Sequence, residues 1–370
     1  MIKMNMKPSL TPLFKNSLKP LLYLLPVTMS LWPLILIYLI VELNWSENWM
    51  SFVPVFLFGI TPILDFYWGD DPERRPEVNK GSFLHKYYSL LPVLCTPAFL
   101  ILVAATPFVL RIEGVSELFF FRYVLSVGLL GGVIAINVAH ELIHRPGKFE
   151  RLCGGLLLSS VSYGGFKVEH IRHHHVHVGT DLDPASSLRG QTLYNFVLNC
   201  LFKNPRNAFR AEADRLKRKK KAFWSLSNEV LLWYCLSFGI AVFYYQAAGL
   251  TGLVAFVLQS LVAICLLESV NYLEHYGLRR KKSASGRYEK VKPRHSWNSN
   301  VYWSSIYLFQ LPRHSDHHEV ASRPYFELQQ HKVAPQLPMS YPCMVLIALI
   351  PPVWFRIMNP KLDAYLEKQD

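Results

Sequence analysis

Long runs of residues without a single charge are the feature that most constrains this chain. Three such runs hold 22, 24 and 38 residues, at positions 20–41, 87–110 and 230–267. A helix that crosses about 30 Å of hydrocarbon needs about 20 apolar residues. Only 18% of the 370 residues are charged, whereas soluble domains carry about 25%. The runs therefore predict membrane-spanning helices and exclude a soluble enzyme.

Six helices fit this pattern best, so we expect an all-α integral membrane protein with six transmembrane helices. The longest run is about twice as long as one crossing requires, and Ala-Ala-Gly-Leu-Thr-Gly at 247–252 is a natural turn for a helical hairpin. The apolar stretch 343–355 is short and holds two prolines, so it is expected to lie at the interface or to pack against the spans. The predicted spans are roughly 20–42, 48–67, 88–110, 118–139, 229–248 and 250–270.

Positive charge predicts the orientation of these spans. With six crossings, both termini share one face with residues 68–87, 139–229 and 271–370, and that face holds every Lys and Arg of the 39 except Arg111 and Arg122. The positive-inside rule makes this face cytoplasmic. The net charge of +13 is therefore a topology signal, and nucleic acid is not needed to explain it. The N-terminus lacks a small-residue cleavage site, so no signal peptide is expected, and we expect a bacterial inner-membrane protein.

The six cysteines exclude several kinds of site. They are scattered along the chain, three fall within predicted spans, and none forms a Cys-x-x-Cys pair. A disulfide framework, a zinc knuckle and an iron–sulfur site in this chain are therefore unsupported.

Nine of the 14 histidines gather in four short segments on the predicted cytoplasmic side. Histidines three or four positions apart share a helix face, so each segment can aim imidazoles at one point. Neutral imidazole binds iron, copper, nickel and zinc. The nine are His140 and His144; His170, His174 and His175; His275; and His314, His317 and His318.

Nine ligands are too many for one metal ion, whereas two ions could share them. Zinc prefers four ligands, so an imidazole-rich pair of sites indicates a redox metal, for which iron is the first choice. Carboxylates beside ligand histidines commonly accept their second ring N–H. The candidates for such supporting roles are Glu141, Glu169, His173, Glu268, Asn271, Glu274 and Asp316.

Other interpretations explain less of this pattern. A zinc protease built on His140, Glu141 and His144, with the glutamate as base, leaves the other histidines unexplained. A metal transporter would place its ligands within several spans, yet these segments lie outside the hydrocarbon. Loose metal scavenging by a solvated tract does not account for the helical spacing.

The motifs together resemble those of the membrane-bound alkane 1-monooxygenases, which are related to the xylene monooxygenase hydroxylase subunit and, more distantly, to membrane fatty-acid desaturases. The resemblance runs from the first span to about residue 360. It is carried, in order, by His-Glu-Leu-Ile-His-Arg at 140–145, Glu-His-Ile-Arg-His-His-His at 169–175, Asp-Pro-Ala-Ser-Ser at 183–187, Asn-Tyr-Leu-Glu-His-Tyr-Gly-Leu at 271–278, His-Ser-Trp-Asn-Ser-Asn at 295–300, Arg-His-Ser-Asp-His-His at 313–318 and Ala-Pro-Gln-Leu-Pro at 334–338.

The resemblance implies that all nine histidines bind two iron ions in one membrane hydroxylase domain over residues 1–370. It also implies an O2-dependent hydroxylase of apolar hydrocarbons, which receives electrons from rubredoxin and an NAD(P)H-dependent reductase. No haem, flavin or bound nicotinamide is expected in this chain. Two residues depart from the family pattern: His173 stands where a small residue is usual, and Pro312 replaces a polar one. A desaturase is the nearest alternative, and the segment 271–276 favours the hydroxylase.

Glu268 is a functional candidate because a carboxylate within a span is costly and is rarely kept without a role. It precedes Asn271 by one helical turn and His275 by two. We therefore expect Glu268 and Asn271 to support the His275 side of the metal site.

Overall fold

The computed structural model describes residues 12–71 and 78–369. Helices dominate this part of the chain, where β-structure is limited to three isolated bridges. The longest helices, α6 (Phe83–Val109), α12 (Leu193–Arg218) and α13 (Glu229–His275), define the architecture. The prediction of an all-α membrane protein agrees with the helical content and with the apolar character of several long helices.

Local sequence explains where the long helices begin. The side chains of Ser82, Ser116, Thr192 and Asn228 each accept a hydrogen bond from a backbone N–H three positions later. These residues cap α6, α7 (Glu117–Leu130), α12 and α13, because Ser, Thr and Asn satisfy the free N–H groups of a first turn.

The first two predicted spans differ in continuity. The first predicted span is broken into α1 (Pro12–Leu22), α2 (Leu25–Met29) and α3 (Trp32–Val41), and its two parts meet at 62°. The second is continuous from Glu47 to Trp68. It comprises η1 (Glu47–Ser51), α4 (Phe52–Val55), the π-helix η2 (Phe56–Ile60) and α5 (Thr61–Trp68).

The fourth span continues beyond its predicted end at residue 139. Helix α7 leads into the π-helix η3 (Gly131–Ile136) and then α8 (Asn137–Ile143), so one apolar segment runs from Glu117 to Ile143. It packs closely against α13, since a Cβ atom at Gly128 would lie 2.7 Å from Val262 Cβ and one at Gly131 would lie 2.8 Å from Ala263 Cβ. Small residues let the two backbones approach, as is common between membrane helices.

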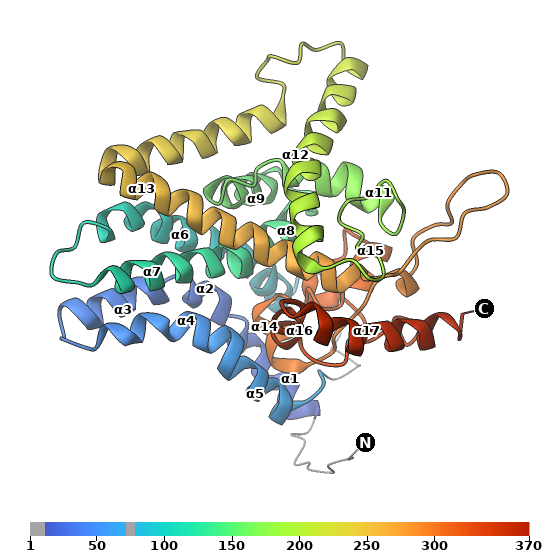
Figure 1. Ribbon diagram of the computed structural model, residues 1–370, viewed down its shortest axis with the longest axis horizontal. Coiled ribbons are helices and arrows are strands. Elements are labelled where there is room, and N and C mark those ends of the chain that lie inside the picture. Colours follow the sequence, from blue (N-terminus) through green and yellow to red (C-terminus); the bar gives the residue numbers. More distant parts are fainter. Residues whose placement is uncertain (1–11, 72–77, 370) are drawn as a thin grey trace.

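Helix α13 contains the hairpin that the sequence predicts. Its 47 residues include a break at Ala248 and Gly249, and Gly249 has a φ of 61°, which favours glycine. Figure 1 shows the two arms folding back side by side. Within the residues that the structure describes, four helices qualify as spans by length and apolarity, or five with the bent N-terminal pair. The prediction of six crossings depends on counting the two arms of α13 separately.

The remaining elements gather at one end of the long helices. The turns between α3 and α4, between α6 and α7 and within α13 lie at the opposite end (Figure 1). The predicted packing segment 343–355 is divided between two helices. The elements at the first end are α9 (Lys148–Ser160), α10 (Phe166–Glu169), the π-helix η4 (His170–His174), α11 (His175–His177), η5 (Pro293–His295), α14 (Tyr302–Tyr307), α15 (His314–Glu319), η6 (Tyr325–Glu327), α16 (Tyr341–Ala348) and α17 (Pro351–Leu366).

Candidate metal centre

The nine predicted ligand histidines come together in two adjacent clusters. In each cluster one possible ligand atom per residue lies within 4.8 Å of every other. Cluster A consists of His140, His144, His170, His175 and His317. Cluster B consists of His174, His275, His314 and His318.

Distances between ring nitrogens fit a shared cation in each cluster. In cluster A, His175 Nε2 lies 3.0 Å from His170 Nε2 and 3.1 Å from His317 Nε2. In cluster B, His314 Nε2 lies 3.1 Å from His275 Nε2 and 2.9 Å from His318 Nε2. At a metal–nitrogen distance of about 2.1 Å, ligands at right angles lie about 3.0 Å apart and tetrahedral ligands about 3.4 Å apart. The shortest nitrogen–nitrogen distances are therefore compatible with ligands that share one cation in each cluster.

Several imidazole nitrogens in the two clusters have no hydrogen-bond partner among the described residues. The Nε2 atoms of His140, His144 and His174 are buried and form no hydrogen bond with any described residue. Burial also lowers the pKa of His170, His175, His314, His317 and His318 well below the usual range. These rings are therefore neutral and can donate a lone pair to a metal ion.

A π-turn divides the second histidine segment between the clusters. The spacing of four positions predicts that His170 and His174 aim at one point, but residues 170–174 form the π-helix η4, whose hydrogen bonds link residues five apart. His170 and His175 therefore meet in cluster A, whereas His174 enters cluster B. This part of the prediction is wrong, because the helical period differs from the one assumed.

Helix α15 is divided in the same way. His314 and His318 are one α-helical turn apart and both belong to cluster B, while His317 points to cluster A. The sequence prediction that these three aim at one point is also wrong. The short helix lies between the clusters, so its two faces serve different sites.

Asp183 contacts a histidine of cluster B. Its Oδ2 lies 3.0 Å from Nδ1 of His174 and also accepts a hydrogen bond from Ser186. A carboxylate that accepts the second ring N–H of a ligand histidine fixes the tautomer and the direction of Nε2. Asp183 was not among the predicted supporting residues, and the only sequence signal was its place in the motif at 183–187.

Glu274 is the predicted supporting carboxylate that lies nearest to a cluster nitrogen. Its Oε2 lies 3.2 Å from His314 Nε2, and its Oε1 accepts a hydrogen bond from the Tyr341 hydroxyl at 2.9 Å. The side chain is buried at the edge of cluster B.

Glu268 and Asn271 lie in a buried polar network on the side of His170. The Glu268 carboxylate accepts hydrogen bonds from the Tyr163 hydroxyl and from the amides of Asn204 and Asn271. Tyr163 stacks on Phe166, and Phe166 stacks on His170 with ring centroids 4.7 Å apart. The network thus reaches a ligand of cluster A through two aromatic rings.

The remaining predicted supporting residues contact other partners. Glu141 accepts hydrogen bonds from Arg145 and from the backbone N–H of Tyr325, so its carboxylate is already engaged and does not suit the base of a zinc protease. Asp316 accepts from Arg323 and His331 and connects α15 to the segment that follows it.

Two further candidates lie beside the clusters rather than in them. His173 Nε2 contacts the Leu182 carbonyl and the Asn207 amide, each at 3.0 Å, so its ring faces away from both clusters. Glu169 is buried, and its Oε1 has no hydrogen-bond partner among the described residues. Burial and the nearby carboxylates of Asp183 and Glu268 raise the pKa of Glu169 well above its usual range.

A buried ion-pair group anchors α15. Asp71 lies 2.7 Å from Arg313 and 2.5 Å from Lys19, and all three side chains are almost inaccessible to solvent. Arg313 directly precedes His314, so the N-terminal helix and the loop at Asp71 help to hold the last ligand helix in place. Sequence reasoning missed this group because its members are more than 50 residues apart.

Comparison with known proteins agrees with the geometry. Residues 117–347 match the family model described as fatty acid desaturase. The chain is 42% identical to alkane 1-monooxygenase 2 of Alcanivorax borkumensis over 88% of this chain and 86% of that protein. It is also 42% identical to alkane 1-monooxygenase 1 of Pseudomonas aeruginosa, over 86% and 84% of the two chains.

A more distant relative acts on aromatic hydrocarbons according to its name. The xylene/toluene monooxygenase hydroxylase component XylM of Pseudomonas putida is 31% identical over 65% of this chain and 63% of its own. The matches at 42% identity cover most of both proteins, including all four histidine segments. This chain is an oxidoreductase of the alkane 1-monooxygenase family, as the motifs of the sequence had indicated.

Proposed function

We propose that this chain is a membrane-bound non-haem di-iron monooxygenase that hydroxylates the terminal C–H bond of an apolar hydrocarbon. The favoured reaction converts an n-alkane to a 1-alkanol, and the closest variant acts on alkyl side chains of aromatics. The observation that carries the proposal is the convergence of nine imidazoles, seven of them buried and two half-buried, on two points. A redox metal pair bound there supplies the activation of O2, while the protein holds the ligands and excludes water.

Cluster A and cluster B provide five and four nitrogen donors. We infer one iron ion in each, with no haem, flavin or nicotinamide in this chain. Iron accepts imidazole ligands and higher coordination numbers, whereas structural zinc is almost always bound by four ligands. Asp183 holds His174 in the tautomer that leaves Nε2 free, and Phe166 fixes the plane of His170 by stacking.

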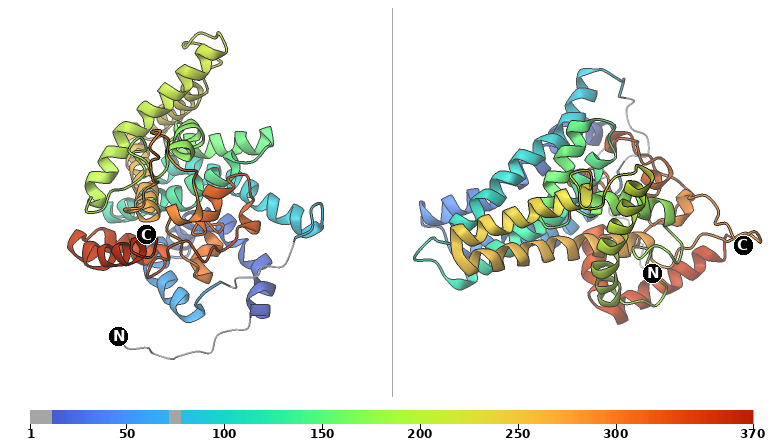
Figure 2. Two further views of the ribbon diagram at one scale, coloured as in Figure 1. Left: turned by 90° about the vertical axis from the view of Figure 1, so that its right-hand side faces the viewer. Right: turned by 90° about the horizontal axis from the view of Figure 1, so that it is seen from above.

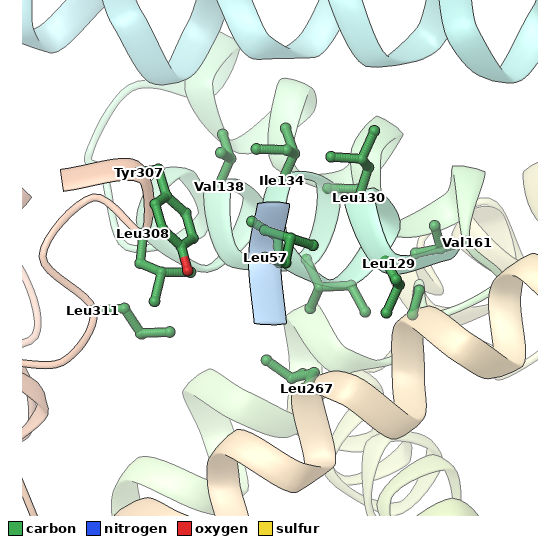
Figure 3. Packing of buried hydrophobic residues seen from close by; sticks show 14 of the residues in the cluster. Leu57, Leu129, Leu130, Ile134, Val138, Val161, Leu267, Tyr307, Leu308 and Leu311 are labelled. Carbon is green, nitrogen blue, oxygen red and sulfur yellow. The ribbon is translucent and has the colours of Figure 1, made fainter. Parts of the chain in front are cut away.

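An apolar cavity beside cluster A supports a hydrocarbon substrate. It has a volume of about 40 Å³ and lies among helices of the predicted spans and α14 and α16. Figure 3 shows Leu57, Leu267, Tyr307, Leu308 and Leu311 around this region. A smaller cavity lined by His140 and His317 shares Asn137 and Leu311 with it. The two cavities mark an apolar approach from the spans to cluster A.

Two electrons must come from another protein, and we propose reduced rubredoxin, itself reduced by an NAD(P)H-dependent reductase. The end of the molecule that bears the clusters also carries most of the Lys and Arg residues, which suits an acidic carrier. The same asymmetry supports an inner-membrane location with the clusters and both termini on the cytoplasmic side.

Product analysis tests the reaction. Purified protein in lipid, supplied with iron and reduced rubredoxin, is offered n-alkanes of increasing length and an alkylbenzene. We expect two irons per chain, O2 uptake that requires both carrier and hydrocarbon, and terminal alcohols as products. One zinc per chain, or an alkene as the product, would contradict the proposal in favour of a protease or a desaturase.

Salt dependence tests the carrier. Attraction between exposed opposite charges is screened over about 10 Å at 0.1 M salt, so turnover with limiting rubredoxin should fall as ionic strength rises. Turnover with saturating carrier is the control and should change little. A rate at limiting carrier that does not respond to salt argues against docking on the basic end.

A further inference from the structure

Helix α12 lies across the spans rather than along them. Figures 1 and 2 show it crossing the direction of α7 and α13 near the end where the clusters lie. One side of the helix is buried, through residues such as Phe196, Cys200 and Ala208. Its other side is exposed, through residues such as Leu198, Phe202 and Arg206.

The open side of α12 carries an apolar row beside a basic row. Tyr194, Leu198 and Phe202 follow one another at intervals of four and are 55%, 57% and 78% exposed. Exposed aromatic and leucine side chains in such a row are typical of a helix that rests in a membrane interface. The neighbouring row contains Lys203, Arg206 and Arg210, all exposed.

The basic row faces a polar cavity of about 400 Å³ between α12 and the segment 181–191. Its lining includes Lys203, Arg206, Arg210 and Arg279, together with the amides of Asn199 and Asn207. Among the residues that the structure describes, none forms an ion pair with the side chains of Lys203, Arg206 or Arg210. Arg279 donates only to the carbonyls of Thr180 and Ser186, which hold its guanidinium without neutralising it.

Two acidic residues line the same cavity but do not cancel its charge. Asp183 is buried and already contacts His174, Ser186 and the backbone of Ala185. Asp181 is exposed at the edge. The cavity lining thus holds four basic side chains and two carboxylates, so its net charge is positive. The three basic side chains of α12 face it without an ion-pair partner among the described residues.

Two exposed leucines add an apolar surface to this basic cavity. Leu182 and Leu188 line the cavity and are 58% and 51% exposed. A ligand here would meet positive charge in the cavity and apolar side chains at its rim. Anionic phospholipids combine these properties, and basic pockets on the cytoplasmic side of membrane proteins bind their head groups.

We propose that α12 and the segment 181–191 form a binding site for an anionic phospholipid of the cytoplasmic leaflet. Lys203, Arg206 and Arg210 bind its phosphate, and its acyl chains lie along Tyr194, Leu198 and Phe202. A concave site with an apolar rim at the level of the interface suits a lipid better than a folded acidic protein. The site borders cluster B, because Asp183 lines the cavity and contacts His174.

Lipid retention by the full-length protein tests this site. Protein purified in detergent is mixed with phosphatidylglycerol or phosphatidylcholine, and bound lipid is counted by native mass spectrometry. The test variant is K203Q/R206Q/R210Q, and the matched control is K219Q/K220Q/K221Q, which removes three exposed charges just beyond the same helix.

We expect the unsubstituted protein and the control to retain phosphatidylglycerol in preference to phosphatidylcholine. The test variant should bind phosphatidylglycerol about 100-fold more weakly, since each basic residue near an anionic lipid contributes about fivefold. If the triple variant is recovered poorly, the single variants R206Q and R210Q replace it. Each is expected to bind phosphatidylglycerol about fivefold more weakly than the unsubstituted protein. A variant F202S should also weaken retention, which separates lipid binding from the binding of free phosphate.

Three outcomes would overturn the proposal. If the test and control variants lose the same amount of bound phosphatidylglycerol, the lipid is held only by general attraction between charges and not at this site. Displacement of the bound lipid by inorganic phosphate, with F202S unaffected, would indicate a free-anion site. Unchanged lipid retention together with weaker rubredoxin binding in the test variant would assign the basic row to the carrier.

Discussion

Asp183 shows how one buried carboxylate can control a metal ligand. The acceptor for His174 Nδ1 lies nine residues further along the chain, in a turn where Asp183 also accepts from Ser186 and Ala185. The ring can then present only Nε2 to cluster B. Supporting contacts of this kind typically change metal affinity by about 10–100-fold.

Replacement of Asp183 by Asn should therefore weaken metal binding in cluster B. The amide keeps one oxygen for the backbone of Ala185 but no longer offers a carboxylate to His174. We expect one of two bound metal ions to be lost at chelator concentrations about 10–100-fold lower than in the unsubstituted protein, as measured by competition titration. Asp181→Asn is the matched control, since Asp181 is exposed two residues away. Equal affinity for both ions in D183N would contradict the assigned role.

At the scale of elements, two π-helices set the geometry of the site. Helix η4 brings His170 and His175 together across five positions and sends His174 to the other cluster. Helix η3 precedes α8, which carries His140. A stretch with the hydrogen-bond pattern of a π-helix rotates the residues that follow it, so both elements determine the direction in which ligand side chains project.

The close contact between η3 and α13 should tolerate no added side chain. A Cβ atom at Gly131 would lie 2.8 Å from Ala263 Cβ and 3.0 Å from Val161 Cγ1. Overpacking costs about 1–3 kcal/mol, so Gly131→Val should lower the melting temperature in detergent and reduce the metal content. Gly239→Ala is the control, because no heavy atom lies within 4 Å of its added Cβ. A G131V protein as stable as G239A would show that this contact is not tight.

At the scale of the whole molecule, the metal ions would act as cross-links. Cluster A joins residues of α8 and its C-cap, η4, α11 and α15, and cluster B joins η4, α13 and α15. These elements span more than 170 positions of the chain. Without a cation, the nine imidazoles face one another with few other partners among the described residues.

Metal removal should therefore destabilise the folded protein. A ligand that binds only the native state adds about 4 kcal/mol at a concentration 1,000 times its dissociation constant. Treatment with a strong chelator should lower the melting temperature, and two equivalents of Fe²⁺ should restore it. His85→Ala, outside both clusters, should respond in the same way as the unsubstituted protein. An unchanged melting temperature after complete metal removal would show that the clusters form without a cation.

Opposite ends of the long helices should face opposite sides of the membrane. Glu113 lies in the exposed turn between α6 and α7, and Lys220 lies in the turn after α12. In intact cells, a membrane-impermeant maleimide should label Glu113→Cys, whereas Lys220→Cys should react only after permeabilisation. The unsubstituted protein, which keeps its own six cysteines, sets the background. Labelling of both variants from outside would contradict the topology derived from charge.

The membrane class, the hairpin in α13, the family and the nine candidate histidines can all be predicted from the sequence alone. Charge-free runs, Lys and Arg asymmetry and the presence of metal-ligand side chains are local properties that can be counted along the chain. Only the folded chain shows how the nine divide into five and four, and that His170 meets His175. It also shows that Asp183 contacts His174 and that the Asp71–Arg313–Lys19 group lies directly before His314. These features depend on a π-turn and on contacts between distant segments, because ring direction is set by packing and not by the α-helical period assumed from spacing.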